Sequence, residues 1–575
     1  MKYRFFLAVS AFVLLLSSCE KTFLEKPITN TTTVDSVFST TTNALSAIAT
    51  AYSECLSQGI TYYTYGSYWN ASVPDNLSGA LNYGFSWSVS QGQVLNGYTS
   101  TGTIEDLNGF TYNYTAIRQA YLVKENIDNV KDMSASDKAI IKAEMQALVA
   151  YRYEQMMIIF GGVPIVNHTF NANDNLAVAR NPLKQVLDSV VSWCDQSAAA
   201  LPSVWSSTYS GRMTKAAALA VKAKALLYAA RPLFNSASPY LDLGSNNNLL
   251  CLGSADPTRW TTAAAASEAL ITEAETNGAL HIINTGNPLD DYGNATSTPG
   301  NAEVILAYKY DYGGSTSNGS NGYGVGTFYN MHNWPAYGNM LTYNFLTQYQ
   351  KSDGTEQTWP DVSAVTTFSD YLTKMGQMEP RFKADYKPWQ MDAPNNPGDS
   401  YWGNASNFQW GSNSVALPTK FYYKASQRGW FEFPIFRLAA AYLSSAEAYN
   451  EAGQTQQALA RLNKIHTRAG LPTVTETDQT KLRAIIQREW AVEFFDENYR
   501  LHDVKHWKLA NLGNGIIGGS IYTFSYNNGS ISTQYNNTNY QRSLWYTAFW
   551  SPKQYLCPFP QTEINKGIIV QNPGY

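Results

Sequence analysis

The chain has 575 residues, of which 44% are apolar and only 15% are charged, so its composition favours a large buried core and argues against intrinsic disorder. The net charge is −4, and lysine and arginine do not cluster anywhere in the sequence. A protein that binds the phosphate backbone needs a positively charged surface, so we do not expect nucleic acid as a partner. Because no long proline- or serine-rich linker interrupts the sequence, we expect one large folded body with long loops.

The chain begins with the features of a bacterial lipoprotein signal. Lys2 and Arg4 precede an apolar run over residues 5–16 that is too short to span a bilayer core. Leucine, two serines and Cys19 follow, which is typical of a site where the thiol is acylated before the leader is removed. We therefore expect residues 1–18 to be removed and acyl chains on Cys19 to tether a single domain, residues 19–575, to a membrane. An ordinary secretory peptide is the alternative.

Several segments show the spacing of apolar residues that is typical of amphipathic helices, and they are rich in alanine, leucine and glutamate. In chain order they are Ala116–Val130, Lys138–Phe160, Leu183–Leu201, Lys215–Leu233, Thr262–Asn277, Phe436–Ala452, Thr455–Ala469 and Gln479–Leu509. Glycine, polar and aromatic residues fill the stretches between them, chiefly 59–113, 235–260, 284–434 and 511–557. These stretches predict loops and short strands, so the expected fold class is mainly α.

Two of the predicted helices, joined at Gly453, have the pattern of a tetratricopeptide-like helix-turn-helix unit. Small residues at Ala446 and Ala458 would let the two helices approach closely in an antiparallel arrangement. A second, looser pair would form from Lys215–Leu233 and Thr262–Asn277. The pattern therefore suggests a tetratricopeptide-like scaffold that displays loop-rich insertions.

Aromatic side chains are concentrated in two of the predicted loops. A pyranose presents a C–H face to a flat ring and hydroxyl groups to amides and carboxylates, so rings beside Asn and Asp suit a sugar. The alternative for each ring is packing of its loop on the scaffold or contact with another protein. The candidate ligand-binding residues are Tyr65, Trp69, Asp75, Asn76, Trp87, Tyr312, Trp334 and Tyr337.

Glu489 and Glu493 lie four residues apart on one predicted helix face and could be the paired carboxylates of a glycosidase. Arg488, Arg500 and Asp503 flank them, so a structural ion-pair network would satisfy their charges equally well. We favour the structural interpretation because nothing else in the sequence supplies a matched acid and base.

His502 and His506 are also four residues apart and could bind a metal ion from one helix face. Asp503 stands where zinc proteases have a glutamate after the first histidine, and no third ligand is apparent in the sequence. We therefore expect no metal and no cofactor. Motifs of nucleophilic catalysis and of phosphate binding are also missing from the sequence, which predicts binding without catalysis.

Four cysteines remain beside Cys19, and they are scattered along the chain without paired spacing. They are Cys55, Cys194, Cys251 and Cys557. This distribution favours free thiols over a disulfide framework or a zinc site.

Blocks of sequence in order along the whole mature chain resemble the SusD/RagB family of outer-membrane nutrient-binding lipoproteins from Bacteroidetes. The blocks include CEKTFLEKP, AEMQALVAYRYEQMMIIFGGVPIV, FRLAAAYLSSAEAYNEAG, IIQREWAVEFFDENYRLHDVKHWK and LCPFPQTEINKGIIVQNPGY. Each block alone is a weak match, and their shared order makes the resemblance specific. Trp490 and Asp496 depart from the family pattern, because arginine and glycine are more usual at these places.

The resemblance implies an α-helical body with tetratricopeptide-like units and a C-terminal RagB/SusD-type region over about 284–575. It also implies a surface-exposed position in the outer membrane, as a lid on a TonB-dependent, SusC-like transporter. We therefore expect a lipid-anchored protein that captures oligosaccharide or polysaccharide by aromatic stacking and delivers it to the transporter without catalysis. Two alternatives remain: a peptide-binding member of the same family, and a surface glycoside hydrolase that uses Glu489 and Glu493.

Overall fold

The computed structural model describes residues 33–57, 73–82, 109–171, 173–309, 340–388, 415–423, 432–509, 518–526 and 539–575. Within these ranges, no helix combines the length and the apolar character that crossing a bilayer requires. The predicted leader and most of the two aromatic loops lie outside the described residues.

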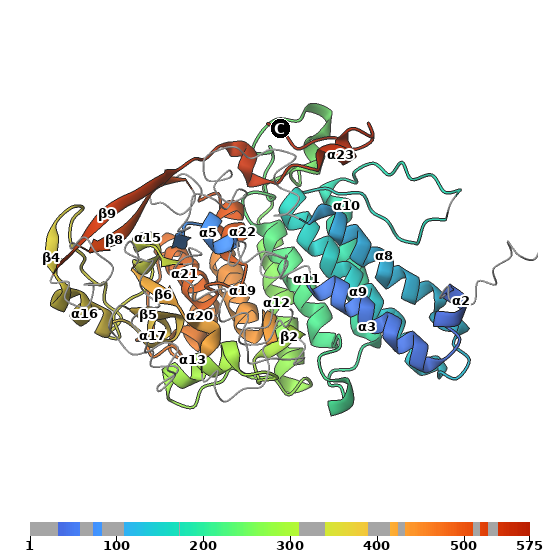
Figure 1. The fold of residues 1–575 in the computed structure, drawn as a ribbon, viewed down its shortest axis with the longest axis horizontal. Helices are drawn as coiled ribbons and strands as arrows, with labels where there is room; N and C mark the ends of the chain where they lie inside the picture. Colours follow the sequence, from blue (N-terminus) through green and yellow to red (C-terminus); the bar gives the residue numbers. More distant parts are fainter. Residues whose placement is uncertain are drawn as a thin grey trace, which may run out of the picture.

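Long helices form one continuous array in which each helix packs against the next (Figure 1). In chain order they are α3 (Thr41–Ser57), α8 (Phe110–Asn126), α9 (Ala135–Phe160), α10 (Leu183–Ala200), α11 (Lys215–Ala230), α12 (Thr258–Thr276), α19 (Leu438–Glu451), α20 (Thr455–His466) and α21 (Gln479–Glu493). The array continues across the long insertion between α12 and α19, because these two helices pack directly on each other. The predicted mainly α fold is confirmed.

Side-chain caps mark the first turns of several long helices. The Ser134 hydroxyl caps α9 by accepting the backbone N–H of Asp137 at 3.1 Å. The Asp478 carboxylate caps α21 by accepting the N–H of Lys481 at 2.9 Å. Such caps satisfy backbone donors that a helix leaves without partners at its first turn.

The predicted helix-turn-helix unit is confirmed in α19 and α20. Ala446 and Ala458 are fully buried where the two helices pack against each other. Gly453 lies between the helices with φ +74°, a backbone conformation in which only glycine is free of steric cost. The second predicted pair is also formed, since α11 packs along α12.

We predict that Gly453→Ala lowers the free energy of unfolding by about 1–2 kcal/mol, because a Cβ is strained at positive φ. A Cβ at Gly453 would meet nothing within 4 Å, so backbone strain is the only cost. Gly376 is a matched control, since its surroundings are equally open and its φ is ordinary. Urea unfolding should show a loss for Gly453→Ala and none for Gly376→Ala; equal effects would contradict the argument.

The predicted single helix over Gln479–Leu509 is wrong, because the chain breaks between α21 and α22 (Arg500–His506). Asp496 and Asn498 adopt φ values of +58° and +64° in this break. A right-handed helix cannot contain such residues, and Asp and Asn are among the non-glycine residues that tolerate them best. The place of Asp496, where the family resemblance suggested glycine, is therefore a turn.

Other elements differ from the prediction of loops. Among its described residues, the segment predicted as loops and short strands over 284–434 contains four α-helices, and the N-terminal part contains α3 and α5, which were not predicted. Besides α3, the helices are α5 (Val73–Leu77), α13 (Pro288–Ser297), α15 (Tyr343–Leu346), α16 (Phe368–Gly376) and α17 (Pro380–Asp385). These five helices from α5 to α17 are short or interrupted by glycine, so apolar periodicity is weak in them.

The described strands form short antiparallel sheets that pair β1 with β3, β2 with β7, β5 with β6, and β9 with both β4 and β8. Their bounds are β1 (Leu81–Asn82), β2 (Val304–Lys309), β3 (Met340–Leu341), β4 (Val365–Thr367), β5 (Tyr386–Pro388), β6 (Ala416–Pro418), β7 (Glu432–Arg437), β8 (Gly519–Tyr526) and β9 (Asn539–Ala548). Strands β4 to β6 lie with α16 and α17 at the left of Figure 1, where a second apolar cluster forms beside that of the helical array.

The four cysteines outside the predicted leader and anchor are free, as predicted. Cys55, Cys194 and Cys251 are buried and Cys557 is half-buried. Burial raises the pKa of the Cys55 thiol to about 12, so this thiol stays protonated at neutral pH and behaves as a small apolar group.

Candidate functional site

The predicted ligand-binding residues fall into two groups. Outside the described residues lie Tyr65, Trp69, Trp87, Tyr312, Trp334 and Tyr337, together with the predicted anchor Cys19. Asp75 and Asn76 are described, and both belong to α5.

Asp75 and Asn76 are buried, with 1% and 0% of their surface exposed, and their helix packs against α22. Burial raises the pKa of the Asp75 carboxyl and the neighbouring Asp496 raises it further, while Arg500 and Lys420 act in the opposite direction. In this structure the two side chains face the scaffold rather than open solvent. Their part in ligand binding stays a prediction.

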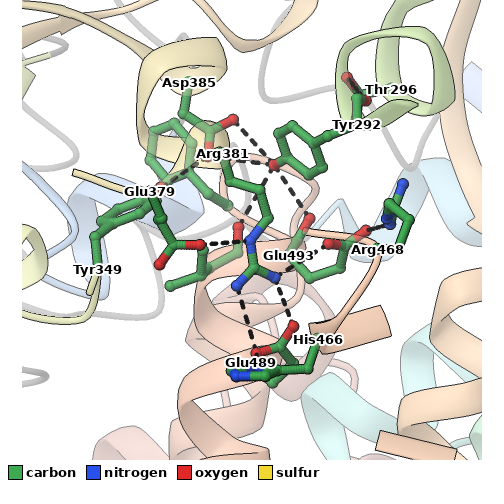
Figure 2. A network of polar contacts seen from close by, with 12 residues as sticks. Tyr292, Thr296, Tyr349, Glu379, Arg381, Asp385, His466, Arg468, Glu489 and Glu493 are labelled. Carbon is green, nitrogen blue, oxygen red and sulfur yellow. Dashed lines mark hydrogen bonds and ion pairs between the residues drawn. The ribbon is translucent and has the colours of Figure 1, made fainter. Parts of the chain in front are cut away.

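A buried polar network surrounds Glu489 and Glu493 on α21 (Figure 2). Arg381 on α17 reaches both, with Nη1 at 2.6 Å from Glu489 Oε1 and 3.3 Å from Glu493 Oε2. Its Nε donates to Glu379 Oε2 at 2.8 Å. On the other side, His466 Nδ1 lies 2.8 Å from Glu489 Oε2. One guanidinium therefore joins three carboxylates.

Two further arginines complete the network around Glu493. Arg468 Nη2 lies 2.5 Å and Arg437 Nη1 3.0 Å from Glu493 Oε1. Arg437 also donates to Glu497 Oε1 at 2.7 Å, and Arg468 to Glu303 Oε1 at 3.2 Å. Since Arg437 ends β7 and Glu303 immediately precedes β2, the network ties the array to the insertion between α12 and α19.

The charges of this network decide between the two interpretations of Glu489 and Glu493. Burial alone would raise the pKa of each carboxyl, but Arg381 beside Glu489 and Arg468 beside Glu493 outweigh burial and hold both pKa values below the ordinary range. A glycosidase acid must instead keep its proton near neutral pH, through a raised pKa. The arrangement therefore supports a structural ion-pair network.

Asp385 adjoins this network and has a different environment. The hydroxyl of Tyr292 donates to its Oδ1 at 2.9 Å, and the hydroxyl of Tyr349 to its Oδ2 at 2.8 Å (Figure 2). Burial raises the pKa of Asp385 to about 7, and Lys420 with the two tyrosines limits the rise. This buried carboxyl therefore titrates close to neutral pH.

The histidine pair on α22 is held by packing. His506 is buried, and its Nε2 lies 3.0 Å from the backbone oxygen of Ile158. Burial lowers the pKa of His506 to about 3 and also lowers that of His502. Among the residues that the structure describes, no three His, Cys, Asp or Glu side chains are grouped so that they could hold a metal ion.

A cavity of about 390 Å³ opens between α8, residues 164–170 and 176–178, and the C-terminal residues 563–569. None of the predicted site residues lines it. The predicted helix begins at Ala116 and the predicted loop covers 59–113, so the prediction placed Phe110 in a loop and Tyr114 outside the helix, whereas both belong to α8 and line the cavity. The three walls are far apart in sequence, and no local pattern indicates that they meet.

Two family models match the sequence. Residues 22–227 match a family described as starch-binding and associating with the outer membrane, and residues 302–575 match the SusD family. Together these matches cover most of the chain. Curated proteins gave no significant match to the sequence.

Solved structures with the same fold extend over nearly the whole chain. A SusD-like protein from Bacteroides fragilis is 20% identical, with a TM-score of 0.73 over 94% of this chain and 98% of its own. A SusD-like carbohydrate binding protein from the same species is 19% identical, with a TM-score of 0.69 over 93% and 99%. Surface glycan-binding protein A from Bacteroides uniformis is 15% identical, with a TM-score of 0.59 over 93% and 99%. At this level of identity the likeness establishes the fold.

Proposed function

Since this chain belongs to the SusD/RagB family, we propose that it captures an oligosaccharide or polysaccharide at the cell surface and hands it to a TonB-dependent, SusC-like transporter of the outer membrane. The observation that carries the proposal is the match of residues 22–227 to a family described as starch-binding and associating with the outer membrane. In this proposal acylated Cys19 tethers a single domain, residues 19–575, beside the transporter.

Binding without catalysis is part of the proposal, and the network around Glu489 and Glu493 supports it. Both carboxylates are buried and each contacts at least one arginine within 3.3 Å. A substrate would have to displace these arginines, which would leave buried charges uncompensated. The network therefore fits a role in the stability of the fold better than a role in catalysis.

The ligand contacts proposed for this function come from rings that the sequence places in two loops. Flat rings stack on the C–H faces of pyranoses, while amides and carboxylates bind hydroxyl groups. Titration of the mature chain with an oligosaccharide mixture should release heat, and Trp69→Ala and Trp334→Ala should each weaken binding by about tenfold, or ~1.4 kcal/mol. Tyr209→Ala is the control, because this exposed ring lies in a different segment and should leave affinity unchanged.

Two outcomes would refute parts of this proposal. Heat from an oligopeptide mixture, with none from oligosaccharides, would favour a peptide-binding member of the family. Release of reducing sugars from polysaccharide by the wild type, abolished by Glu493→Gln, would establish a hydrolase instead. Co-purification of the lipidated chain with an outer-membrane transporter would test the partner independently of the ligand.

A further inference from the structure

The cavity beside α8 is lined in part by residues of two sequence blocks, the one that ends in GGVPIV and the C-terminal one. The proposed function gives these residues no role in ligand binding. One wall begins at Pro164, in the turn that follows α9, and the C-terminal block supplies another through Glu563 and Ile569. Arg180 joins these walls, since its Nε donates to the Gly162 oxygen at 2.7 Å and its Nη1 to the Val570 oxygen at 2.8 Å. The Tyr114 hydroxyl on α8 donates to the Pro164 oxygen at 2.7 Å. Hydrogen bonds from these side chains to backbone oxygens therefore fix all three walls before any ligand binds.

The turn itself requires its glycines. Gly161 has φ +79°, and a Cβ at Gly162 would lie 2.3 Å from the Asn181 oxygen. The segment that continues from the turn is also held, because the Glu125 carboxylate accepts the N–H of Thr169 at 3.0 Å. The segments around the cavity are therefore held in place by the fold itself.

Apolar side chains form most of the cavity wall. They include Phe110, Phe170, Val166, Leu176 and Ile569. Leu176 is 68% exposed, which is unusual for a leucine that lines a cavity. Covering these side chains with an apolar ligand would remove apolar surface from water, which is the main favourable term in such binding.

One positive charge at this cavity has no counter-charge. Arg118 on α8 lines the cavity and is exposed, and the described residues give it no hydrogen-bond or ion-pair partner. The acidic residue that lines the cavity, Glu563, is already paired with Lys566 at 2.8 Å. The charge left for a ligand is therefore that of Arg118, and a guanidinium prefers a planar carboxylate.

We propose that this cavity is a second ligand site, which takes a small molecule with an apolar body and one carboxylate group. Its volume of about 390 Å³ lies within the range of ~300–1,000 Å³ that is usual for pockets of small ligands. The apolar body lies against Phe110 and Val166, and the carboxylate pairs with Arg118. None of the residues that line the cavity is a proposed glycan contact, so this proposal stands even if the glycan proposal fails.

The test is calorimetric titration of the full mature chain with 4-phenylbutyrate and with octanoate, each beside its neutral amide. If the site accepts any apolar ligand body, both carboxylates should bind. If it requires an aromatic ring, only 4-phenylbutyrate should bind. Each bound carboxylate should bind about fivefold more tightly than its amide, and Arg118→Gln should remove that preference. Lys464→Gln removes an exposed positive charge from α20 and is the matched control, with no expected effect.

A second variant tests the cavity without removing charge. Thr115 lines the cavity from an exposed position on α8, so Thr115→Trp should fill the space without disturbing the core and should abolish binding of both carboxylate and amide. An unchanged circular dichroism spectrum would verify its fold. The proposal is overturned if neither carboxylate gives heat at millimolar concentration, or if both Arg118→Gln and Thr115→Trp bind like the wild type.

Discussion

Arg381→Met is expected to lower the free energy of unfolding by about 3–5 kcal/mol, the largest loss that we predict for a single ion-pair residue. Arg381 is 1% exposed and contacts the carboxylates of Glu379, Glu489 and Glu493. Methionine keeps much of the apolar stem but leaves three buried carboxylates with less positive charge. The cost comes from these uncompensated charges rather than from lost packing.

The matched control for this variant lies on the same helix as the two glutamates. Arg488 pairs with Glu356 at 2.5 Å, but their side chains are 32% and 59% exposed. Solvent screens this pair, so Arg488→Met should cost only about 0–1 kcal/mol. Urea unfolding followed by circular dichroism measures both variants. Similar small losses in the two would show that the buried network contributes little.

Local patterns predicted the long helices from α8 to α21, because these helices carry their own apolar periodicity, whereas α3 was not predicted. Ala446, Gly453 and Ala458 identified one helix-turn-helix unit, since close helix approach and a left-handed turn each require small residues. The break after α21 escaped prediction because the residues on both sides of Asp496 and Asn498 fit a helix.

The partners of Glu489 and Glu493 could not be predicted from the residues beside them. The sequence offered Arg488 and Arg500 as neighbours, whereas the structure pairs the glutamates with Arg381, Arg437 and Arg468. Successive residues of a helix point about 100° apart, so Arg488 cannot face the same side as Glu489. Which distant arginine reaches the buried face depends on tertiary packing.

The same limit applies to the candidate sites. Asp75 and Asn76 have the residue types that suit sugar hydroxyl groups, but the sequence did not indicate that α5 packs both against α22. The cavity beside α8 combines residues from near positions 110, 170 and 569, and sequence spacing carries no information about their proximity.

The second large effect that we predict is a dependence of the free energy of unfolding on pH, caused by the titration of Asp385. Its folded pKa of about 7 lies well above the ordinary value of 3.8. Between these values the folded state holds a proton that the unfolded chain has released, so the contribution of Asp385 is fully present at low pH and is lost as the pH rises through about 7.

Asp385→Asn removes this titration while keeping the shape of the side chain. From pH 5 to pH 8, the free energy of unfolding of the wild type should therefore fall by about 2–3 kcal/mol relative to that of the variant. The difference between the two proteins is the informative quantity, because other buried carboxyls with raised pKa values, such as Glu303 and Glu379, titrate equally in both. Urea unfolding at intervals of pH across this range measures it.

Two further variants separate this cause from others. Tyr349→Phe removes a hydrogen bond that favours the ionised carboxylate, so the folded pKa of Asp385 should rise and the loss of stability should continue to a higher pH than in the wild type. Asp242→Asn is the control, because the hydrogen bond from Asn247 lowers the pKa of this exposed aspartate and keeps it ionised throughout the range. Its stability should follow the wild type in parallel. Parallel curves for Asp385→Asn and the wild type would mean that Asp385 is ionised in the folded protein at pH 5, with Lys420 outweighing its burial.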